Sequence, residues 1–567
     1  MKRRFKLPIF GWVTRYDRAW LRSDLVAGLT VWAVLVPEAL AYASIAGVSP
    51  VVGLYAAPGA LIFYAAFGSS RHLVTGPMAA TAALSAAAVG DLATSGSEEF
   101  LQLTITLGIV TGILAVAAGL LRLGFLANFI SEPVLKGFII GLALTIIVGQ
   151  LPKLFGIEKG SGNFFEQAWD FLTNLGGTSG LTLLVGVVSL VLVIGLKEYA
   201  PIVPGSLVAV LLGILAVKIF DLDDHGVTIV GQIDSGLPSI GLPDVAAHRY
   251  LDLAPAAVGV MLVAFAEGLG AAKTYAAREH YEIDVNREFI GLGAANIASG
   301  FSSGMVVNGS LSKTAVNASA GAKSQLSGLV VAALTIVTLL FLTGLFEDLP
   351  EATLAAVVIA ALIELVDIPA LVRLYRLYTT QLGRIYGVAA RPDFIAAVAA
   401  MLGVLIFDTL PGLFIGIAMS LLLLLYRASR PHVALLGRVP GSPEAYGDVD
   451  RRPEKESIPG VVILRVEGGL FFANAEPIRK AVTLHAAEEG TRAVVLDGET
   501  VPYIDLTAAT MLIELAADLK RRGVELVMAR DVGQVRDVLS RVEQKEDRIR
   551  IFPTVPDAIA ALTPAER

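Results

Sequence analysis

The sequence lacks cysteine and is poor in charge. With no cysteine among 567 residues, disulfides, thiolate metal sites and cysteine nucleophiles are excluded. Charged residues make up 17% of the chain, well below the roughly one quarter typical of soluble domains, whereas 55% of the residues are hydrophobic. Most of the chain is therefore expected to lie in a lipid bilayer.

Other absences narrow the function. The six histidines show no metal-ligand spacing, and there is no glycine-rich phosphate loop. The net charge of -7 comes without a basic stripe that would suit nucleic acid. The sequence thus predicts no metal site, no cofactor, no nucleic-acid partner and no enzyme active site.

Hydrophobicity divides the chain into regions. Residues 23–430 are a succession of apolar runs, and 457–567 read as a charged soluble domain, with a linker predicted over 431–456. Residues 1–22 are rich in lysine and arginine, and the run that follows is too long for a signal-peptide core. The positive-inside rule then places residues 1–22 on the cytoplasmic side of the inner (plasma) membrane.

The apolar runs predict fourteen membrane helices. An even number returns the C-terminal domain to the cytoplasmic side, and the connection after the twelfth helix carries four arginines, Arg373, Arg376, Arg384 and Arg391, as the rule requires. The expected helices lie near 25–47, 51–68, 76–90, 100–121, 129–151, 180–199, 202–221, 254–273, 286–300, 309–321, 325–346, 352–372, 393–409 and 411–427.

Two of these segments are too short to cross a bilayer. Helices over 76–90 and 309–321 rise about 20 Å, against a hydrocarbon core of about 30 Å. Each follows a short stretch that is typical of a strand, at 73–75 and at 305–307. We expect two half-helices that begin inside the membrane at Gly76 and Gly309.

These features recur along the chain. Gly76 and Gly309 are 233 residues apart, while Glu38 and Glu267, each the lone acid of its apolar run, are 229 residues apart. The membrane part is therefore interpreted as two repeats of seven helices, about 23–221 and 254–430. Because seven is odd, the second repeat enters the membrane in the opposite sense, as in many secondary transporters.

Facing half-helices predict an anion site. Their free N–H groups and positive dipole ends point at one central place, and the second half-helix adds hydroxyls and the cation Lys313. Lys313 can neutralise a bound anion or hold the site together. The alternative is that Lys313 extends to an interface and that Ser310, Ser312 and Thr314 only bond to backbone. Glu38 carries a similar alternative, a structural bond to a neighbouring helix, but a lone acid in the membrane favours a substrate or proton pathway.

Several stretches closely resemble the sulfate permease (SulP) family of anion transporters. The membrane part carries AGLT (27–30), PEALAYA (37–43), GLYAA (53–57), GSSRH (68–72), Gly76-Pro77 and NREFIGLGAANI (286–297). The resemblance implies fourteen helices in two inverted repeats, core and gate subdomains with an elevator-like movement, and a homodimer. It also implies that the family's anion pocket falls here on Glu38, Tyr42, Met78 after Gly76-Pro77, Leu311, Ser312 and Lys313. Glu267 matches an acid used in ion coupling and in bracing the second half-helix.

Departures from the family pattern bear on the coupling ion. Many members have glutamine where this chain has Glu38, and an acid there favours proton coupling. Sodium-coupled relatives tend to have a hydroxyl where this chain has Ala271, which disfavours sodium. Burial disfavours the charged form of Glu38 and ionised Glu38 repels an anion, so proton and anion are expected to load together.

The C-terminal region resembles a STAS domain. Strands separated by helices predict a small sheet covered by helices, and LFFANAE (470–476) and residues 496–508 resemble STAS sequences. Leu506 stands where bacterial STAS regulators carry a phosphorylated serine, so that switch is expected to be absent. Thr507 is a weak phosphoacceptor candidate, and its residue type favours a helix N-cap instead. Assembly or regulation is the expected role.

The sequence thus favours a proton-coupled symporter of a small anion of the sulfate, bicarbonate or C4-dicarboxylate class. An anion exchanger, a channel-like conductor and an anion receptor that signals through the STAS domain remain as alternatives.

Overall fold

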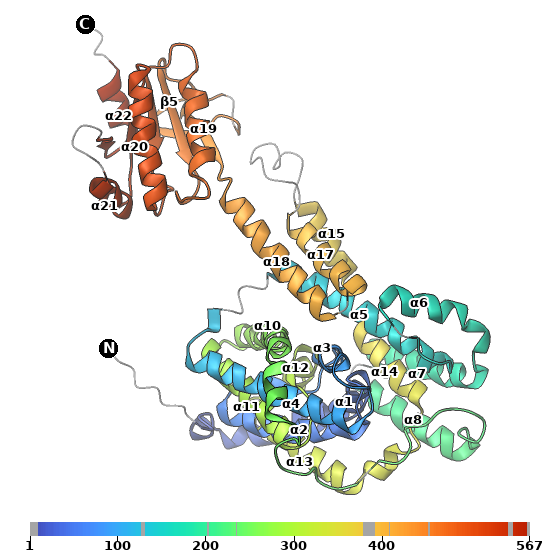
Figure 1. Cartoon of the computed structure of the whole chain (residues 1–567). Coiled ribbons are helices and arrows are strands. Elements are labelled where there is room, and N and C mark those ends of the chain that lie inside the picture. The colour runs from blue at the N-terminus through green and yellow to red at the C-terminus, as the bar shows by residue number, and fades with distance from the viewer. Residues whose placement is uncertain are drawn as a thin grey trace. The chain divides into compact units, whose positions relative to one another are not determined.

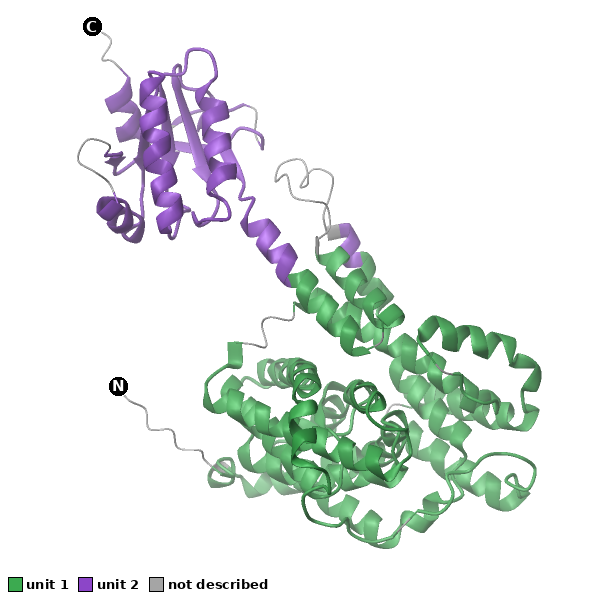
Figure 2. Ribbon diagram, in the orientation of Figure 1, with its two compact units in different colours: residues 1–372, 393–420 green, residues 373–392, 421–567 purple. Residues whose placement is uncertain are grey.

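The computed structural model describes residues 9–563 except 126–130, 161, 201–202, 234, 378–391, 408, 452–453 and 543–547. The chain forms two compact units, one of residues 1–372 and 393–420 and the other of residues 373–392 and 421–567 (Figure 2). The basic residues before position 9, and Arg384 and Arg391, which entered the predicted topology, lie outside the described residues.

Each of the fourteen predicted membrane segments contains a helix. Eight helical stretches within the described residues are long and apolar enough to cross a membrane on their own. The first repeat comprises α1 (Leu21–Ile45), α2 (Pro50–Phe67), α3 (Ala79–Gly90), α4 (Glu98–Leu120), α5 (Glu132–Phe155), α7 (Gly180–Tyr199) and α8 (Gly205–Phe220). The second comprises α10 (Ala254–Arg278), α11 (Val285–Phe301), α12 (Leu311–Ser319), α13 (Leu326–Phe341), α14 (Glu351–Ile363), α17 (Pro392–Phe407) and α18 (Thr409–Ala428). Three short helices were not predicted: α6 (Phe164–Thr173), α9 (Ala247–Asp252) and α15 (Ile368–Leu377).

Local sequence sets several of the helix starts. The Ser97 side chain accepts a hydrogen bond from the backbone of Phe100, and the Asp284 carboxylate accepts two from the first turn of α11. Such caps satisfy N–H groups that have no partner within the helix. Pro50 opens α2, where its missing N–H costs nothing.

The two short segments are half-helices preceded by strands, but their boundaries differ from the prediction. Strands β1 (Val74–Gly76) and β2 (Asn308–Ser310) pair antiparallel, with Thr75 opposite Gly309. The predicted strand at 305–307 is therefore wrong by three residues, and the helices begin at Ala79 and Leu311 instead of Gly76 and Gly309.

The shift has a cause in α11. The Ser299 hydroxyl donates to the carbonyl of Met305, and the Asn296 amide bonds both the carbonyl and the N–H of Val307. These side chains satisfy the backbone of 305–307. The next three residues are then the ones that pair with β1.

The membrane helices form two groups (Figure 1). In the first, α11 packs against α4 and α2, and α13 packs against α1 and α2. In the second, α14 packs against α5 and α7, while glycines allow α5 to approach α17 at Ala397 and α18 to approach α17 at Ala400. The first four helices of each repeat thus make one group, the core, and the last three make the other, the gate.

The second unit is built around a six-stranded sheet of order β4-β3-β5-β6-β7-β8. Four of its strands are parallel: β5 (Val461–Val466), β6 (Ala493–Asp497), β7 (Glu525–Ala529) and β8 (Arg550–Phe552). Helices α19 (Ala475–Ala486), α20 (Leu506–Arg521) and α21 (Gly533–Val542) cover one face, and α22 (Val555–Leu562) covers the other.

Two predictions for this unit need correction. The region predicted as a linker, 431–456, contains β3 (Val433–Val439) and β4 (Ser442–Asp448), and β3 pairs with β5. The linker is wrong there because Ala434 and Leu436 alternate into the buried core, a short pattern that the surrounding charge hides. Thr507 is also not the N-cap of α20, because the Asp505 carboxylate accepts the capping hydrogen bond from Ala508.

Candidate functional site

Strand pairing brings the starts of the two half-helices together. Because β1 and β2 are antiparallel, α3 and α12 leave the paired strands in opposite directions. The N-cap of α3, Met78, makes no side-chain cap, so the first amides of that helix are left without an acceptor from it. At α12 the Ser310 hydroxyl accepts a hydrogen bond from one backbone amide of the first turn, that of Lys313. Both ends therefore offer N–H groups and positive dipole ends to an anion.

Lys313 lies between these two helix starts. Its Nζ is 2.6 Å from Glu38 Oε2, 3.4 Å from the carbonyl oxygen of Pro77 and 3.5 Å from the sulfur of Met78. Lys313 is 1% exposed, and Glu38 is 8% exposed. An ammonium group so buried needs acceptors, and they come from α1 and from the start of α3. The alternative that the Lys313 side chain extends to a membrane interface is therefore wrong.

Helix α1 contributes the acid and the aromatic residue. Glu38 and Tyr42 are one helical turn apart, so both side chains project from the same face of α1. The Tyr42 ring centroid is 5.1 Å from Lys313 Nζ, a distance that allows a cation–π contact. Five predicted site residues thus converge: Glu38, Tyr42, Pro77, Met78 and Lys313.

The other predicted site residues take different positions. Ser310 is buried, and its hydroxyl lies 3.1 Å from that of Ser312. Leu311 and Ser312 are exposed at the first turn of α12. Gly76 and Gly309 lie in the paired strands and not at helix starts.

Glu267 is the second acid singled out in the membrane part, and it forms a hydrogen bond with β2. Its Oε2 accepts a hydrogen bond of 2.8 Å from Asn308 Nδ2. The next residue, Gly309, lies so close to α10 that an added Cβ would stand 2.9 Å from Gly268 Cα. Glu267 therefore bonds the strand that precedes α12, at the place where the resemblance implies a bracing role.

A buried carboxylate, Glu288, was not predicted as a functional group. It accepts hydrogen bonds from the Tyr64 hydroxyl, the Ser69 amide and hydroxyl, and the Ser70 amide, at 2.6–3.0 Å. Ser69, Ser70 and Glu288 belong to two stretches that carried the resemblance, 68–72 and 286–297, whereas Tyr64 lies in α2. Their contact holds the chain that leads into β1, and spacing in the sequence gives no signal for it.

The chain matches known sequences along most of its length. Residues 21–389 match the profile described as the Sulfate permease family, and residues 452–558 match the STAS domain. The chain belongs to the sulfate permease family. A probable sulfate transporter of Mycobacterium tuberculosis is 37% identical, with 96% of each chain covered. High affinity sulfate transporter 2 of Stylosanthes hamata is 32% identical over 98% of this chain and 86% of its own. Both relatives are named as transporters and not as enzymes.

Solved structures share the fold of this sulfate permease. The murine solute carrier 26 family member A9, an anion transporter in an inward-facing state, matches with a TM-score of 0.87 at 24% identity, covering 99% of this chain and 96% of its own. The transmembrane domain of a cyanobacterial bicarbonate transporter matches with a TM-score of 0.60 at 22% identity, covering 71% of this chain and 98% of its own. At this identity the likeness concerns the fold alone.

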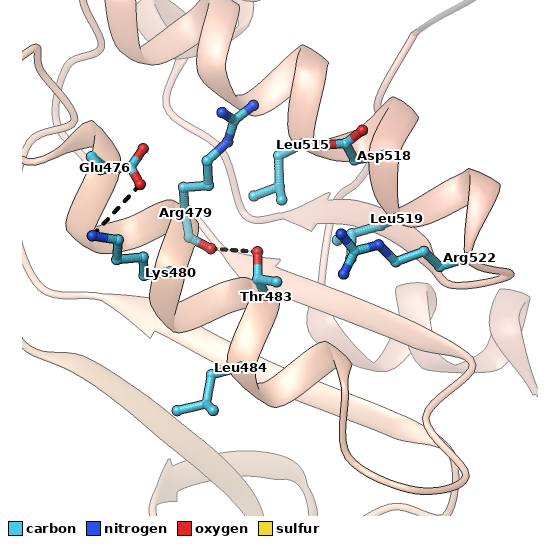
Figure 3. Close-up of a pocket in the computed structure, with 9 residues that line it drawn as sticks. All are labelled: Glu476, Arg479, Lys480, Thr483, Leu484, Leu515, Asp518, Leu519 and Arg522. Carbon is cyan, nitrogen blue, oxygen red and sulfur yellow. Dashed lines mark hydrogen bonds and ion pairs between the residues drawn. The ribbon is translucent and has the colours of Figure 1, made fainter.

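The STAS domain contains a groove of about 410 Å³ between α19 and α20 (Figure 3). Arg479, Lys480 and Arg522 line it together with Glu476 and Asp518. Lys480 pairs with Glu476 at 3.8 Å across one turn of α19. This mixture of signs favours neither a polyanion nor a polycation.

Proposed function

We propose that this member of the sulfate permease family transports a small anion across the membrane together with protons. The proposal rests above all on the buried ion pair between Lys313 and Glu38 at the meeting point of the half-helices. A cation that is to bind a transported anion must also be able to release it. The Glu38 carboxylate gives Lys313 a partner with which it can pair after the anion has left.

The ion pair suggests how a proton can be coupled to the anion. While Glu38 is ionised it occupies Lys313 and repels an anion nearby. Protonation of Glu38 removes both effects, so the lysine charge and the amides at the starts of α3 and α12 become available to the anion. By linkage, a bound anion must then favour the protonated form of Glu38. Proton and anion load and leave together, which is symport.

The chemistry of the site limits the substrate to a class. Helix dipoles, hydroxyls and one ammonium suit a compact oxyanion, because its oxygens accept several hydrogen bonds at once. Sulfate, bicarbonate and C4-dicarboxylates fit this description. The names of the sequence relatives, which are sulfate transporters, favour sulfate.

We further propose an elevator-type movement, in which the core carries the site past the gate. Glu38, Glu267 and Lys313 all belong to core helices, so the site can move as one body. We also propose that the protein is a homodimer, as the family resemblance implies.

The distribution of lysine and arginine supports a cytoplasmic N-terminus and STAS domain. With the N-terminus inside, the connections that face outward contain Lys159 and Arg249 as their only lysine or arginine. The inward connections contain Arg71, Arg122, Lys323 and the four arginines of 373–391. The excess lies on the inner side, where the positive-inside rule expects it.

Uptake into proteoliposomes tests the proposal. Labelled sulfate and bicarbonate are offered to the full chain with an inward proton gradient, an inward sodium gradient or none. We expect the proton gradient to drive accumulation, and Glu38→Gln to retain binding but lose the response to the gradient. Uptake that is indifferent to the proton gradient in the native chain refutes proton coupling.

The same preparation distinguishes the alternatives. An exchanger requires an anion inside the vesicle before uptake begins. A channel gives currents in a planar bilayer far above the turnover of a carrier, and a receptor binds the anion without flux.

A further inference from the structure

Helix α6 carries an exposed apolar stripe. Phe165, Trp169 and Leu172 follow one another at spacings of four and three residues, so they share one face, and they are 53%, 67% and 58% exposed. The polar residues Glu166, Asp170 and Thr173 lie on an adjacent face of the same helix. A helix of ten residues is about 15 Å long and cannot cross a bilayer.

Contacts hold α6 close to the ends of two membrane helices. Asn163 and Glu166 form a capping box that starts the helix. The Phe171 ring packs edge-to-face on Phe155 at the end of α5, with ring centroids 5.0 Å apart. The amide of Ser179, just before α7, donates to the carbonyl of Phe155. The segment 156–178 is thus a closed insertion whose two ends meet, and α6 stays beside α5 (Figure 1).

The next membrane helix along the chain, α7, has an apolar surface as well. Leu184, Val188 and Val191 of α7 are exposed at the same spacing of four and three residues. Because α7 is long and apolar enough to cross a membrane, this exposed face contacts lipid. Along the chain, the stripe on α6 directly precedes a helix whose exposed face contacts lipid.

The second repeat carries a matching stripe. Like α6 in the first repeat, α15 follows the fifth helix of its repeat and precedes the sixth. Ile368, Val372 and Tyr375 are exposed at the same spacing, with Arg373 and Arg376 on the adjacent face. Because the stripe recurs in both repeats, it is not a chance feature of a single loop.

We propose that α6 lies in the outer membrane interface, with Phe165, Trp169 and Leu172 among the lipid chains and its acidic face toward water. Tryptophan favours this boundary, and amphipathic helices of this kind bind in the plane of the membrane. The occupant of the stripe is the lipid bilayer. In this position α6 fixes the depth of α5 and α7 in the membrane. The choice of the outer leaflet rests on the proposed topology, but burial in lipid does not.

The lack of native cysteine allows a direct test in the full chain. Trp169→Cys and Leu172→Cys place a nitroxide label on the stripe, and Thr173→Cys places one on the polar face of the same helix. Each variant is reconstituted into liposomes, and the label is exposed to oxygen, which concentrates in lipid, or to a nickel chelate, which stays in water. We expect the ratio of oxygen to nickel accessibility at 169 and 172 to exceed that at 173 severalfold.

Two results overturn the proposal. Equal nickel accessibility at 169 and 173 means that the stripe faces water. Labels at 169 that are shielded from both reagents and broadened by a second label mean that another copy of the chain covers the stripe. Leu172→Cys repeats the test if the loss of Trp169 prevents folding. Labelling of Thr173→Cys by an impermeant maleimide, added outside intact cells, reports the leaflet separately, and none of these readouts depends on transport.

Discussion

Replacing Lys313 by methionine removes a buried charge while keeping most of the side-chain volume. In the native chain Lys313 Nζ is 2.6 Å from Glu38 Oε2. At an effective dielectric constant of about 20, Coulomb's law gives an attraction of about 6 kcal/mol at that distance. Desolvation of both groups offsets part of this attraction, and breaking one partner of a buried pair costs about 3–5 kcal/mol in unfolding free energy. The variant is therefore expected to lose about 3–5 kcal/mol of unfolding free energy, because Glu38 is left buried without its cation.

The free energy of unfolding is measured by titration with SDS in mixed micelles at pH 7. Glu38→Gln combined with Lys313→Met removes both charges, and we expect it to recover most of the loss at pH 7. Lys197→Met is the control, because Lys197 pairs with Glu364 at the exposed surface of the gate and its loss should cost less than about 1 kcal/mol. The reasoning fails if the double variant loses the sum of the two single losses.

Three further predictions concern other parts of the molecule. Gly309→Ala should reduce sulfate uptake at least about tenfold by pushing β2 away from α10, whereas Gly76→Ala, at the end of β1, should change uptake less than about twofold; similar uptake by both variants contradicts this steric argument. Glu267→Gln keeps an acceptor for β2, so it should retain sulfate-induced thermal stabilisation, and loss of that stabilisation would mean that the charge itself is needed. A fragment of residues 431–567 should be soluble and melt cooperatively, whereas 457–567, which lacks two strands, should aggregate; equal behaviour in size-exclusion chromatography would disprove the role of β3.

Much of the membrane fold could be predicted because it depends on composition along a continuous stretch. A helix that crosses lipid needs a long apolar run, and that run is visible in one window of sequence. The half-helices were visible for the same reason, since their runs are too short. Helices α6 and α15 were missed because ten residues with a mixed composition resemble a loop.

Boundaries at the site depended on contacts that a local pattern does not contain. The valines at 306–307 favour a strand. However, side chains of α11 bond the backbone here, Asn296 at Val307 and Ser299 at Met305. The register of β1 on β2, and so the starting points of α3 and α12, follows from this competition.

The sequence alone determined that Glu38, Glu267 and Lys313 must have partners, because an ionisable group in the membrane is costly wherever it lies. Only the tertiary structure decided which partners they have. Glu38 and Lys313 are 275 residues apart, and they meet because the pairing of two three-residue strands brings the start of α12 beside α1. The cost of placing a charge in the membrane depends on the residue type and on the apolar run around it, and both are visible in the sequence. The partner of that charge depends on distances that exist only after the two repeats have packed together.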